Sequence, residues 1–249
     1  MSRELREKER ELLDMLSGDK GYYNARNAEG IRVGKLVGYA ATYDTPEGPL
    51  HYVGEGYWNF PRGAERNPAV LREFVKRIIC SEIRDSTFDK GQPYQIDCAF
   101  GCPEGGILPA YEIAREFKCY FSRADKKVTE VATEGRREKS ELIFGRHTVE
   151  PDWRVAIVED VGNNFSTTDK AIKLVEGTGA KVVAIICMVN RSPKGVCVYN
   201  YEGRDIDVLQ SVLIPTPEYR QDDPYVAEDV AKGNVVWKPK DNWNDLLAA

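Results

Sequence analysis

The chain has 249 residues, with 35 Lys and Arg against 40 Asp and Glu, which gives a formal net charge of −5 at pH 7. Hydrophobic residues make up 42% of the sequence, which is ordinary for a globular protein and excludes a disordered chain. The mild acidity argues against a dedicated nucleic-acid binder, and no apolar run is long enough to span a bilayer. We therefore expect neither a nucleic-acid nor a membrane partner. Because the charged N-terminal residues do not resemble a signal peptide, we also expect a cytoplasmic protein.

The cysteine pattern predicts reduced thiols. Six cysteines are present, and no two of them stand at Cys-x-x-Cys spacing. Only two histidines accompany them, so a structural zinc site is not expected.

The N-terminal third predicts a helix, a small hood and a second helix. Residues 3–16 are highly charged and place three leucines on one helical stripe. Residues 31–60 are rich in Gly, Tyr and Thr, and the turn at 46–49 separates two short extended runs, as in a hairpin. Asn67 and Pro68 then form a helix start, followed by apolar residues at helical spacing up to Ile79.

From residue 94 onwards the sequence alternates between strand and helix patterns. The expected elements are a strand at 94–100, a loop at 101–106, a helix at 107–117, a strand at 119–122, hairpin arms at 126–132 and 140–144, a strand at 154–158, a helix at 167–176 and a strand at 181–189. Such alternation predicts an α/β fold with a doubly wound, mainly parallel sheet. In these sheets ligands collect at the carboxyl ends of the strands.

We expect a single domain over residues 1–249. Its parts would be an N-terminal helix and hood at 1–66, a core at 67–214 and a C-terminal tail at 215–249. The sequence suggests no role for the tail, although it contains several aromatic and acidic residues.

The sharpest motif is an apolar strand that ends in two adjacent carboxylates, Glu159 and Asp160. Such acids can accept hydrogen bonds from a vicinal diol, as on a ribose, and the polar loop at 161–168 offers N–H groups and hydroxyls to a phosphate. Ser166 and Asp169 also have the spacing of a helix cap. An ordinary strand-to-helix turn that uses acids and a cap explains the same pattern.

Together with residues 171–183, this motif resembles the phosphoribosyl diphosphate signature of type I phosphoribosyltransferases. Within that family the chain looks most like the orotate phosphoribosyltransferases, roughly over residues 50–192 and most strongly over 155–191. The resemblance implies a phosphoribosyltransferase-type sheet and an enzyme that transfers ribose 5-phosphate from phosphoribosyl diphosphate to a pyrimidine base. Orotate is the expected base, Mg²⁺ would be carried on phosphoribosyl diphosphate, and a homodimer is expected.

The resemblance also assigns residues to the phosphoribosyl diphosphate site. Glu159 and Asp160 would hold the ribose hydroxyls. The residues expected to cradle the 5′-phosphate are Asn163, Asn164, Phe165, Ser166 and Thr167. The glycine-rich loop after the first strand of the sheet corresponds to the diphosphate-binding loop of the family, with Cys102, Pro103, Glu104 and Gly105 as its contacts.

Basic residues are expected to neutralise the departing diphosphate, because Arg and Lys are the natural partners of phosphate oxygens. Arg123 fits the basic residue that the family has at a strand end, and Lys126 and Lys127 follow it. The basic residues at 136–139, Arg136, Arg137 and Lys139, fit the family's mobile catalytic loop only loosely. A solvated, charged hairpin face explains them equally well.

Three residues are candidates for contact with the base. Arg191 matches an Arg that meets the base in the family and would pair with the orotate carboxylate. Tyr57 and Trp58 resemble an aromatic stretch near the base, where they would stack on its ring or form the hood core. Glu55 precedes them, where the family normally has a basic residue.

A further departure leaves two alternatives open. Phe165 stands where the family has a small residue, so its side chain either narrows the phosphate site or points away from it. A ring that narrows the phosphate site favours a non-catalytic regulator that binds a nucleotide or phosphoribosyl diphosphate. A separate functional alternative is a salvage enzyme that acts on a different nucleobase.

Overall fold

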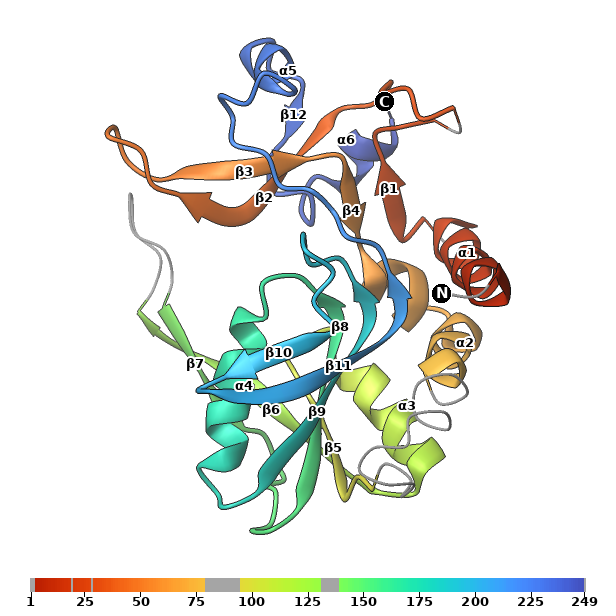
Figure 1. Ribbon diagram of the computed structural model, residues 1–249, viewed down its shortest axis with the longest axis vertical. Coiled ribbons are helices and arrows are strands. Elements are labelled where there is room, and N and C mark those ends of the chain that lie inside the picture. Colours follow the sequence, from red (N-terminus) through yellow and green to blue (C-terminus); the bar gives the residue numbers. More distant parts are fainter. Residues whose placement is uncertain (1–2, 19, 28, 79–94, 131–138, 249) are drawn as a thin grey trace.

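The computed structural model of the chain describes residues 3–18, 20–27, 29–78, 95–130 and 139–248. Seven strands form the main sheet: β5 (Cys98–Gly101), β6 (Tyr120–Glu130), β7 (Lys139–Phe144), β8 (Arg154–Gly162), β9 (Lys181–Asn190), β10 (Val198–Tyr201) and β11 (Arg204–Leu213). They lie in the order β10-β11-β9-β8-β5-β6-β7 (Figure 1). The five central strands are parallel, whereas β10 and β7 pair antiparallel at the two edges. The predicted α/β fold with a mainly parallel sheet is confirmed.

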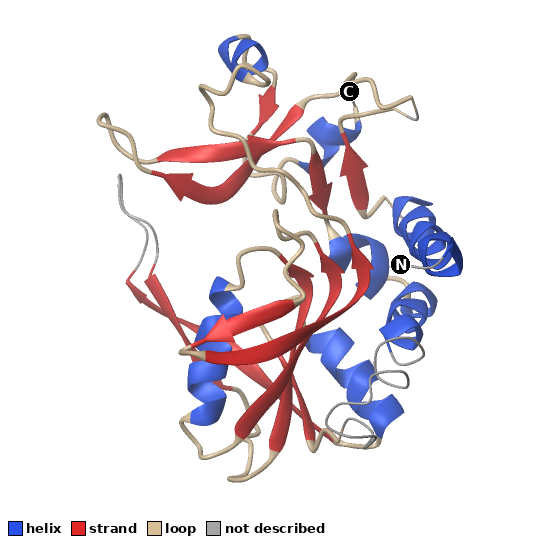
Figure 2. Ribbon diagram, in the orientation of Figure 1, coloured by secondary structure: helices blue, strands red, loops and turns tan. Residues whose placement is uncertain are grey.

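Helices cover both faces of this sheet (Figure 2). The four long helices are α1 (Arg3–Gly18), α2 (Pro68–Ile78), α3 (Ile107–Phe117) and α4 (Ser166–Glu176). The first three pack into one apolar cluster with the sheet, and α4 packs into a second cluster on the opposite face. As predicted, α2 begins at Pro68, and the Asn67 side chain accepts a hydrogen bond from the N–H of Ala69 at 3.3 Å.

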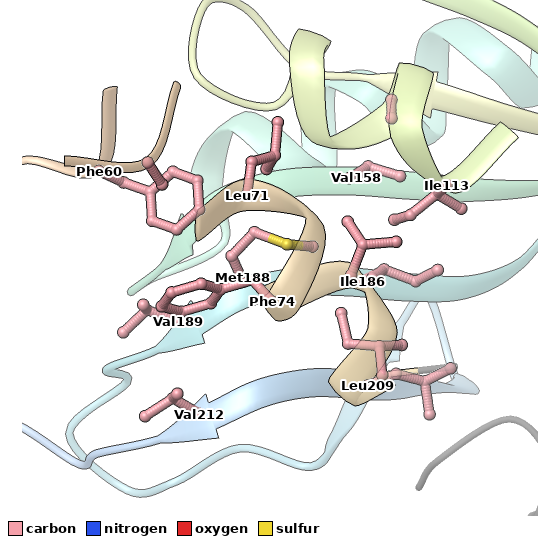
Figure 3. Close-up of a cluster of buried hydrophobic side chains, with 14 of the residues drawn as sticks. Phe60, Leu71, Phe74, Ile113, Val158, Ile186, Met188, Val189, Leu209 and Val212 are labelled. Carbon is pink, nitrogen blue, oxygen red and sulfur yellow. The ribbon is translucent and has the colours of Figure 1, made fainter. Parts of the chain in front are cut away.

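Burial on both faces explains why the central strands are almost wholly apolar. Along β9, Ile186 and Met188 point into the first cluster, while Ile185 and Cys187 point into the second. Figure 3 shows the first cluster, where Phe74 of α2 lies among residues from β8, β9 and β11. Each fully buried large side chain in such a cluster contributes about 1.5–3 kcal/mol.

The chain order creates a switch point between β5 and β8. From β5 the chain crosses through α3 to β6 on one side, and later returns to β8 on the other side of β5. The loops that leave the carboxyl ends of these two neighbours diverge, which is where open parallel sheets bind ligands.

A hood lies over this end of the sheet (Figure 1). Its elements are β1 (Tyr22–Asn24), β2 (Leu36–Tyr43), β3 (Leu50–Gly54), β4 (Gly56–Trp58), the short helix η1 (Pro61–Glu65), α5 (Ala227–Ala231), β12 (Val235–Val236) and α6 (Trp243–Leu247). The hairpin predicted within 31–60 is β2 and β3. The hood is larger than the sequence indicates, because β12 pairs in parallel with β2 and brings the C-terminal region into it.

Three local features differ from the sequence predictions. Strand β8 does not end at Val158 but continues to Gly162, and β6 runs from Tyr120 to Glu130 instead of ending at Ser122. Helix α4 begins at Ser166 after Phe165 at the capping position, where Phe165 makes no cap hydrogen bond, and the Asn164 side chain accepts one from the N–H of Ser166 at 3.2 Å. Residues Ile79, Arg136 and Arg137, and the parts of the predicted elements within 79–94 and 131–138, lie outside the described residues.

In the described part of the chain, no helix has both the length and the apolar character needed to cross a membrane. None of the five described cysteines is part of a disulfide.

Candidate active site

A cavity of about 280 Å³ lies at the switch point between β5 and β8. Its walls come from the glycine-rich loop, the end of β8, the start of α4 and the hood. Its lining residues include Tyr57, Pro103, Glu104, Gly105, Glu159, Asp160, Asn163, Asn164, Phe165, Ser166, Thr167 and Lys240. Most of the residues predicted to hold phosphoribosyl diphosphate are thus brought together.

The two acids have different surroundings because β8 continues through them and adjacent strand residues point to opposite faces. Glu159 is buried at 8% exposure, and it accepts hydrogen bonds from the Cys102 thiol and, at 3.5 Å, from the Thr168 hydroxyl. Burial, reinforced by the neighbouring Asp160 carboxylate, raises the pKa of Glu159 to about 8. Burial therefore favours the protonated form of Glu159 more than it does in an ordinary carboxyl group.

Asp160 is half-buried and faces the glycine-rich loop. A Cβ atom on Gly105 would overlap the Asp160 carboxylate, so only glycine permits this close approach. Burial raises the pKa of Asp160 above its ordinary value, although backbone hydrogen bonds to its own N–H and that of Val161 oppose the shift. Glu65 of η1 lies nearby, and burial together with Asp160 and Glu104 raises the pKa of Glu65 to about 7.

The start of α4 faces the cavity. Phe165 has φ = 58°, a left-handed conformation, and its side chain is 5% exposed. The ring lies against Gly162 and, with 5.2 Å between ring centroids, against Tyr199. Phe165 therefore contributes to the cavity wall while its ring packs in the core behind the loop.

Cys102 is the one predicted diphosphate contact that does not line this cavity within the described residues. Its side chain is fully buried in the cluster below the loop. Its contact is with Glu159, and burial raises the pKa of the Cys102 thiol well above its ordinary value.

A second cavity of about 940 Å³ adjoins the first and opens under the hood. The two share Tyr57, Asn163, Asn164, Ser166 and Lys240. The larger one is lined in addition by Gly38, Tyr39, Ala40, Ala41, His51, Arg191, Trp237, Lys238 and Pro239. A flat ring held there would lie beside any sugar held in the smaller cavity.

Arg191 lines the larger cavity and already contacts two other side chains. Its guanidinium stacks on the Tyr39 ring, 4.4 Å from the ring centroid, and lies 3.7 Å from the Glu218 carboxylate. The same carboxylate oxygen accepts a hydrogen bond from the Asn163 amide at 2.9 Å. Glu218 therefore joins the loop predicted to bind phosphate to the Arg predicted to bind the nucleobase.

The two aromatic residues of the hood separate into different roles. Tyr57 lines both cavities, with its ring 5.8 Å from that of Trp243. Trp58 contributes to the wall of the smaller cavity, but its side chain is 5% exposed and packs in the core against Tyr22. Glu55 lies outside both linings and forms an ion pair with Arg26 at 2.8 Å.

The basic residues predicted to meet the leaving group lie elsewhere. Arg123, Lys126 and Lys127 are all within β6, and none of them lines either cavity. Arg123 pairs with Asp125 at 3.1 Å, and Lys127 pairs with Glu141 of β7 at 3.0 Å. Lys139 lies in β7.

Sequence reasoning missed the contribution of the C-terminal region to both cavities. Trp237, Lys238, Pro239 and Lys240 reach the site because β12 joins the hood. The only sequence signal for them is an aromatic residue followed by two lysines, a combination that suits a flat base and an anion.

Comparison with known proteins gives sequence relatives that cover part of the chain. No family model matches the chain. It is 36% identical over 119 residues to an orotate phosphoribosyltransferase of Carboxydothermus hydrogenoformans, which is 47% of this chain and 56% of the relative. It is 34% identical over 98 residues to that of Parvibaculum lavamentivorans, 39% of this chain and 45% of the relative. The chain thus spans about half the length of the curated relatives that it matches.

Solved structures give partial likenesses. An orotate phosphoribosyltransferase from Aeropyrum pernix has a TM-score of 0.43 at 13% identity, over 79% of this chain and 94% of that one. An adenine phosphoribosyltransferase from Saccharomyces cerevisiae has a TM-score of 0.48 at 14% identity, over 69% and 93%. The predicted resemblance is confirmed by the sequence matches: over about half its length, this chain is similar to orotate phosphoribosyltransferases.

Proposed function

We propose that this protein is a phosphoribosyltransferase, which transfers ribose 5-phosphate from phosphoribosyl diphosphate to a ring nitrogen of a nucleobase and releases diphosphate. The observation that carries the proposal is the pair of adjoining cavities at the switch point, one walled by acids, a glycine-rich loop and a helix start, the other by aromatic rings and Arg191. The names of the sequence relatives support the same reaction.

The smaller cavity suits the ribose and its phosphate. Asp160 provides a carboxylate for the ribose hydroxyls, next to the buried Glu159. The start of α4 supplies the positive end of the helix dipole and the N–H groups after that of Ser166, which already donates to the Asn164 side chain, to the 5′-phosphate. Because the Phe165 ring is packed in the core, it does not fill the space beside these groups.

The larger cavity suits the base. Tyr57 lies at the boundary between the two cavities, where a base and a ribose would be joined. Arg191 supplies donors for an oxygen or carboxylate on the ring. Orotate, named in the sequence relatives, is the first base to test.

The reaction needs no covalent nucleophile, because the bond between the sugar and the diphosphate breaks as the base nitrogen approaches. The protein's work is to hold both substrates in line and to stabilise the departing charge. Mg²⁺ is proposed to enter on the diphosphate as part of the substrate. The free thiols suit a reducing compartment, and the proposed location is the cytoplasm. The homodimer stays a prediction.

The test is a screen of nucleobases with phosphoribosyl diphosphate and Mg²⁺, in which diphosphate release is measured. Asp160→Asn is expected to lower turnover by on the order of a hundredfold while the fold survives, since it removes a positioning group at the ribose. Asp222→Asn, at an exposed position, is the matched control and is expected to leave turnover unchanged. Wild-type turnover by Asp160→Asn would contradict the ribose role, and binding without turnover in the wild type would indicate a regulator.

Glu218 favours a second candidate within the same reaction class. Its carboxylate already faces Arg191, so it opposes the approach of a second carboxylate and favours a base that lacks one. If orotate is nevertheless the substrate, Arg191→Ala should raise the KM for orotate by about tenfold or more, because a charge-assisted contact is lost. The KM for phosphoribosyl diphosphate should change far less. If the base is neutral, Glu218→Gln should improve the use of orotate relative to that base.

A further inference from the structure

The segment Trp237–Lys240 is anchored near the site at both of its ends. On one side it follows β12, which pairs with β2, and the Trp237 ring packs directly on the backbone of Gly38, where any side chain would overlap it. On the other side, the Asn242 amide donates a hydrogen bond to the Trp237 carbonyl at 2.8 Å. A turn with Lys238 at φ = 49° then leads into α6.

This anchoring places Lys240 at the wall shared by the two cavities. Its ammonium lies 4.0 Å from the Glu104 carboxylate in the glycine-rich loop, and both side chains are largely exposed, at 77% and 88%. Such a loose, solvated pair is worth little by itself, so the Lys240 ammonium is free to exchange Glu104 for an anion.

Lys240 is also the one Lys or Arg among the described residues that line the smaller cavity. Three carboxyl groups line the same cavity, those of Glu104, Glu159 and Asp160. A diphosphate is an anion and finds acidic side chains on these walls, so it needs a cation of the protein besides the ion it carries. The predicted cations of β6 lie outside the cavity.

We propose that Lys240, carried on the C-terminal part of the hood, binds the diphosphate of phosphoribosyl diphosphate at the glycine-rich loop. This inference rests on the proposed function and adds to it a substrate-binding residue from a region outside the strand–helix core. Since Lys240 also lines the larger cavity, its contact with diphosphate would draw the hood segment over both substrates.

The test compares Lys240→Ala, Lys240→Arg and a matched control, Lys232→Ala. Lys232 lies in the same region but pairs with Glu228 on the surface. Lys240→Ala is expected to raise the KM for phosphoribosyl diphosphate by about tenfold or more and to weaken binding of inorganic diphosphate with Mg²⁺ in calorimetry by a similar factor. Lys240→Arg, which keeps the charge, should retain most of the affinity, and Lys232→Ala should match the wild type.

Salt provides a readout that a purely structural role would not move. Diphosphate binding by the wild type should weaken as ionic strength rises, and by Lys240→Ala it should weaken less. Wild-type diphosphate affinity and KM in Lys240→Ala would overturn the inference while leaving the proposed function intact. Wild-type protein that neither binds phosphoribosyl diphosphate nor turns over any base would overturn the proposed function instead.

Discussion

At the scale of single residues, Phe165 shows how a bulky side chain fits into a phosphate loop. Its left-handed backbone turns the ring out of the loop and into the cluster beneath α4, next to Tyr199. Adopting this conformation costs a non-glycine residue roughly 1–2 kcal/mol, which burial of the ring offsets. At this position the aromatic residue thus belongs to the core.

We therefore expect Phe165→Gly to lower the free energy of unfolding by about 3 kcal/mol, because the lost ring packing exceeds the relief of backbone strain. The KM for phosphoribosyl diphosphate should change only modestly. Denaturant unfolding of the variant and the wild type measures the first effect, and Asp222→Asn, which is exposed and lies outside both cavities, is the control. Unchanged stability combined with a much lower KM would mean that the ring occupies the phosphate site.

At the scale of elements, the glycine-rich loop depends on contact with β8 as well as on its own conformation. Gly105 lies against the Asp160 carboxylate and Gly106 against the Val158 carbonyl, so the loop is fitted to the end of that strand. A methyl group at Gly106 would overlap backbone atoms, whereas one at Gly105 would displace the Asp160 carboxylate or the loop itself.

Gly105→Ala is accordingly expected to displace Asp160 or the loop and to lower kcat/KM for phosphoribosyl diphosphate by at least about tenfold, since small misplacements of positioning groups are costly. Steady-state kinetics provides the measurement. Gly18→Ala, where no atom lies within 4 Å of the added methyl group, is the control. Wild-type kinetics in Gly105→Ala would show that the loop does not position substrate.

At the same scale, the arm formed by β6 and β7 explains why Arg123, Lys126 and Lys127 do not line either cavity. Residues Lys126–Glu130 extend beyond the part of β6 that pairs with β5, and they are largely exposed in a two-stranded ribbon. Charged side chains are tolerated in such a ribbon because both of its faces meet water. The charged residues therefore predict the end of a strand in the sequence, although β6 continues through them.

At the scale of the whole molecule, the buried acids make stability depend on pH. The pKa of Glu159 is raised to about 8 in the folded protein, against 4.5 for the unfolded chain. Between these two values the folded state binds more protons than the unfolded state, so the free energy of unfolding falls as pH rises. Glu65, whose pKa is raised to about 7, adds to the same trend.

Thermal unfolding from about pH 5 to about pH 9 should therefore show decreasing stability that levels off above the higher pKa. In Glu159→Gln, which cannot ionise, the decrease should be smaller. Asp222→Asn at the surface is again the control. The same slope in Glu159→Gln and the wild type would show that Glu159 is not the group that titrates.

The parts of the molecule that the sequence predicts are those with a periodic apolar pattern. Helix α3 has the expected bounds, and β9 differs by one residue, because buried apolar side chains mark their lengths. The loops of the smaller cavity follow β5 and β8 as expected, and its two predicted carboxylates lie within the last four residues of β8. Strand β12 has only two residues, too few for any pattern, so the role of the C-terminal region depends on long-range pairing that local sequence does not reveal.

The pairing of β12 with β2 also has a consequence for the order of folding. It joins Val235 to Leu36, which are separated by most of the sequence, so the two ends of this long segment must meet before the pair can form. Contacts so distant along the chain incur the largest entropy of loop closure and form late, whereas the core strands meet through nearer contacts. The hood should thus be the last part to assemble and the first to detach in local unfolding, so a molecule with a complete core can still lack the hood walls of both cavities.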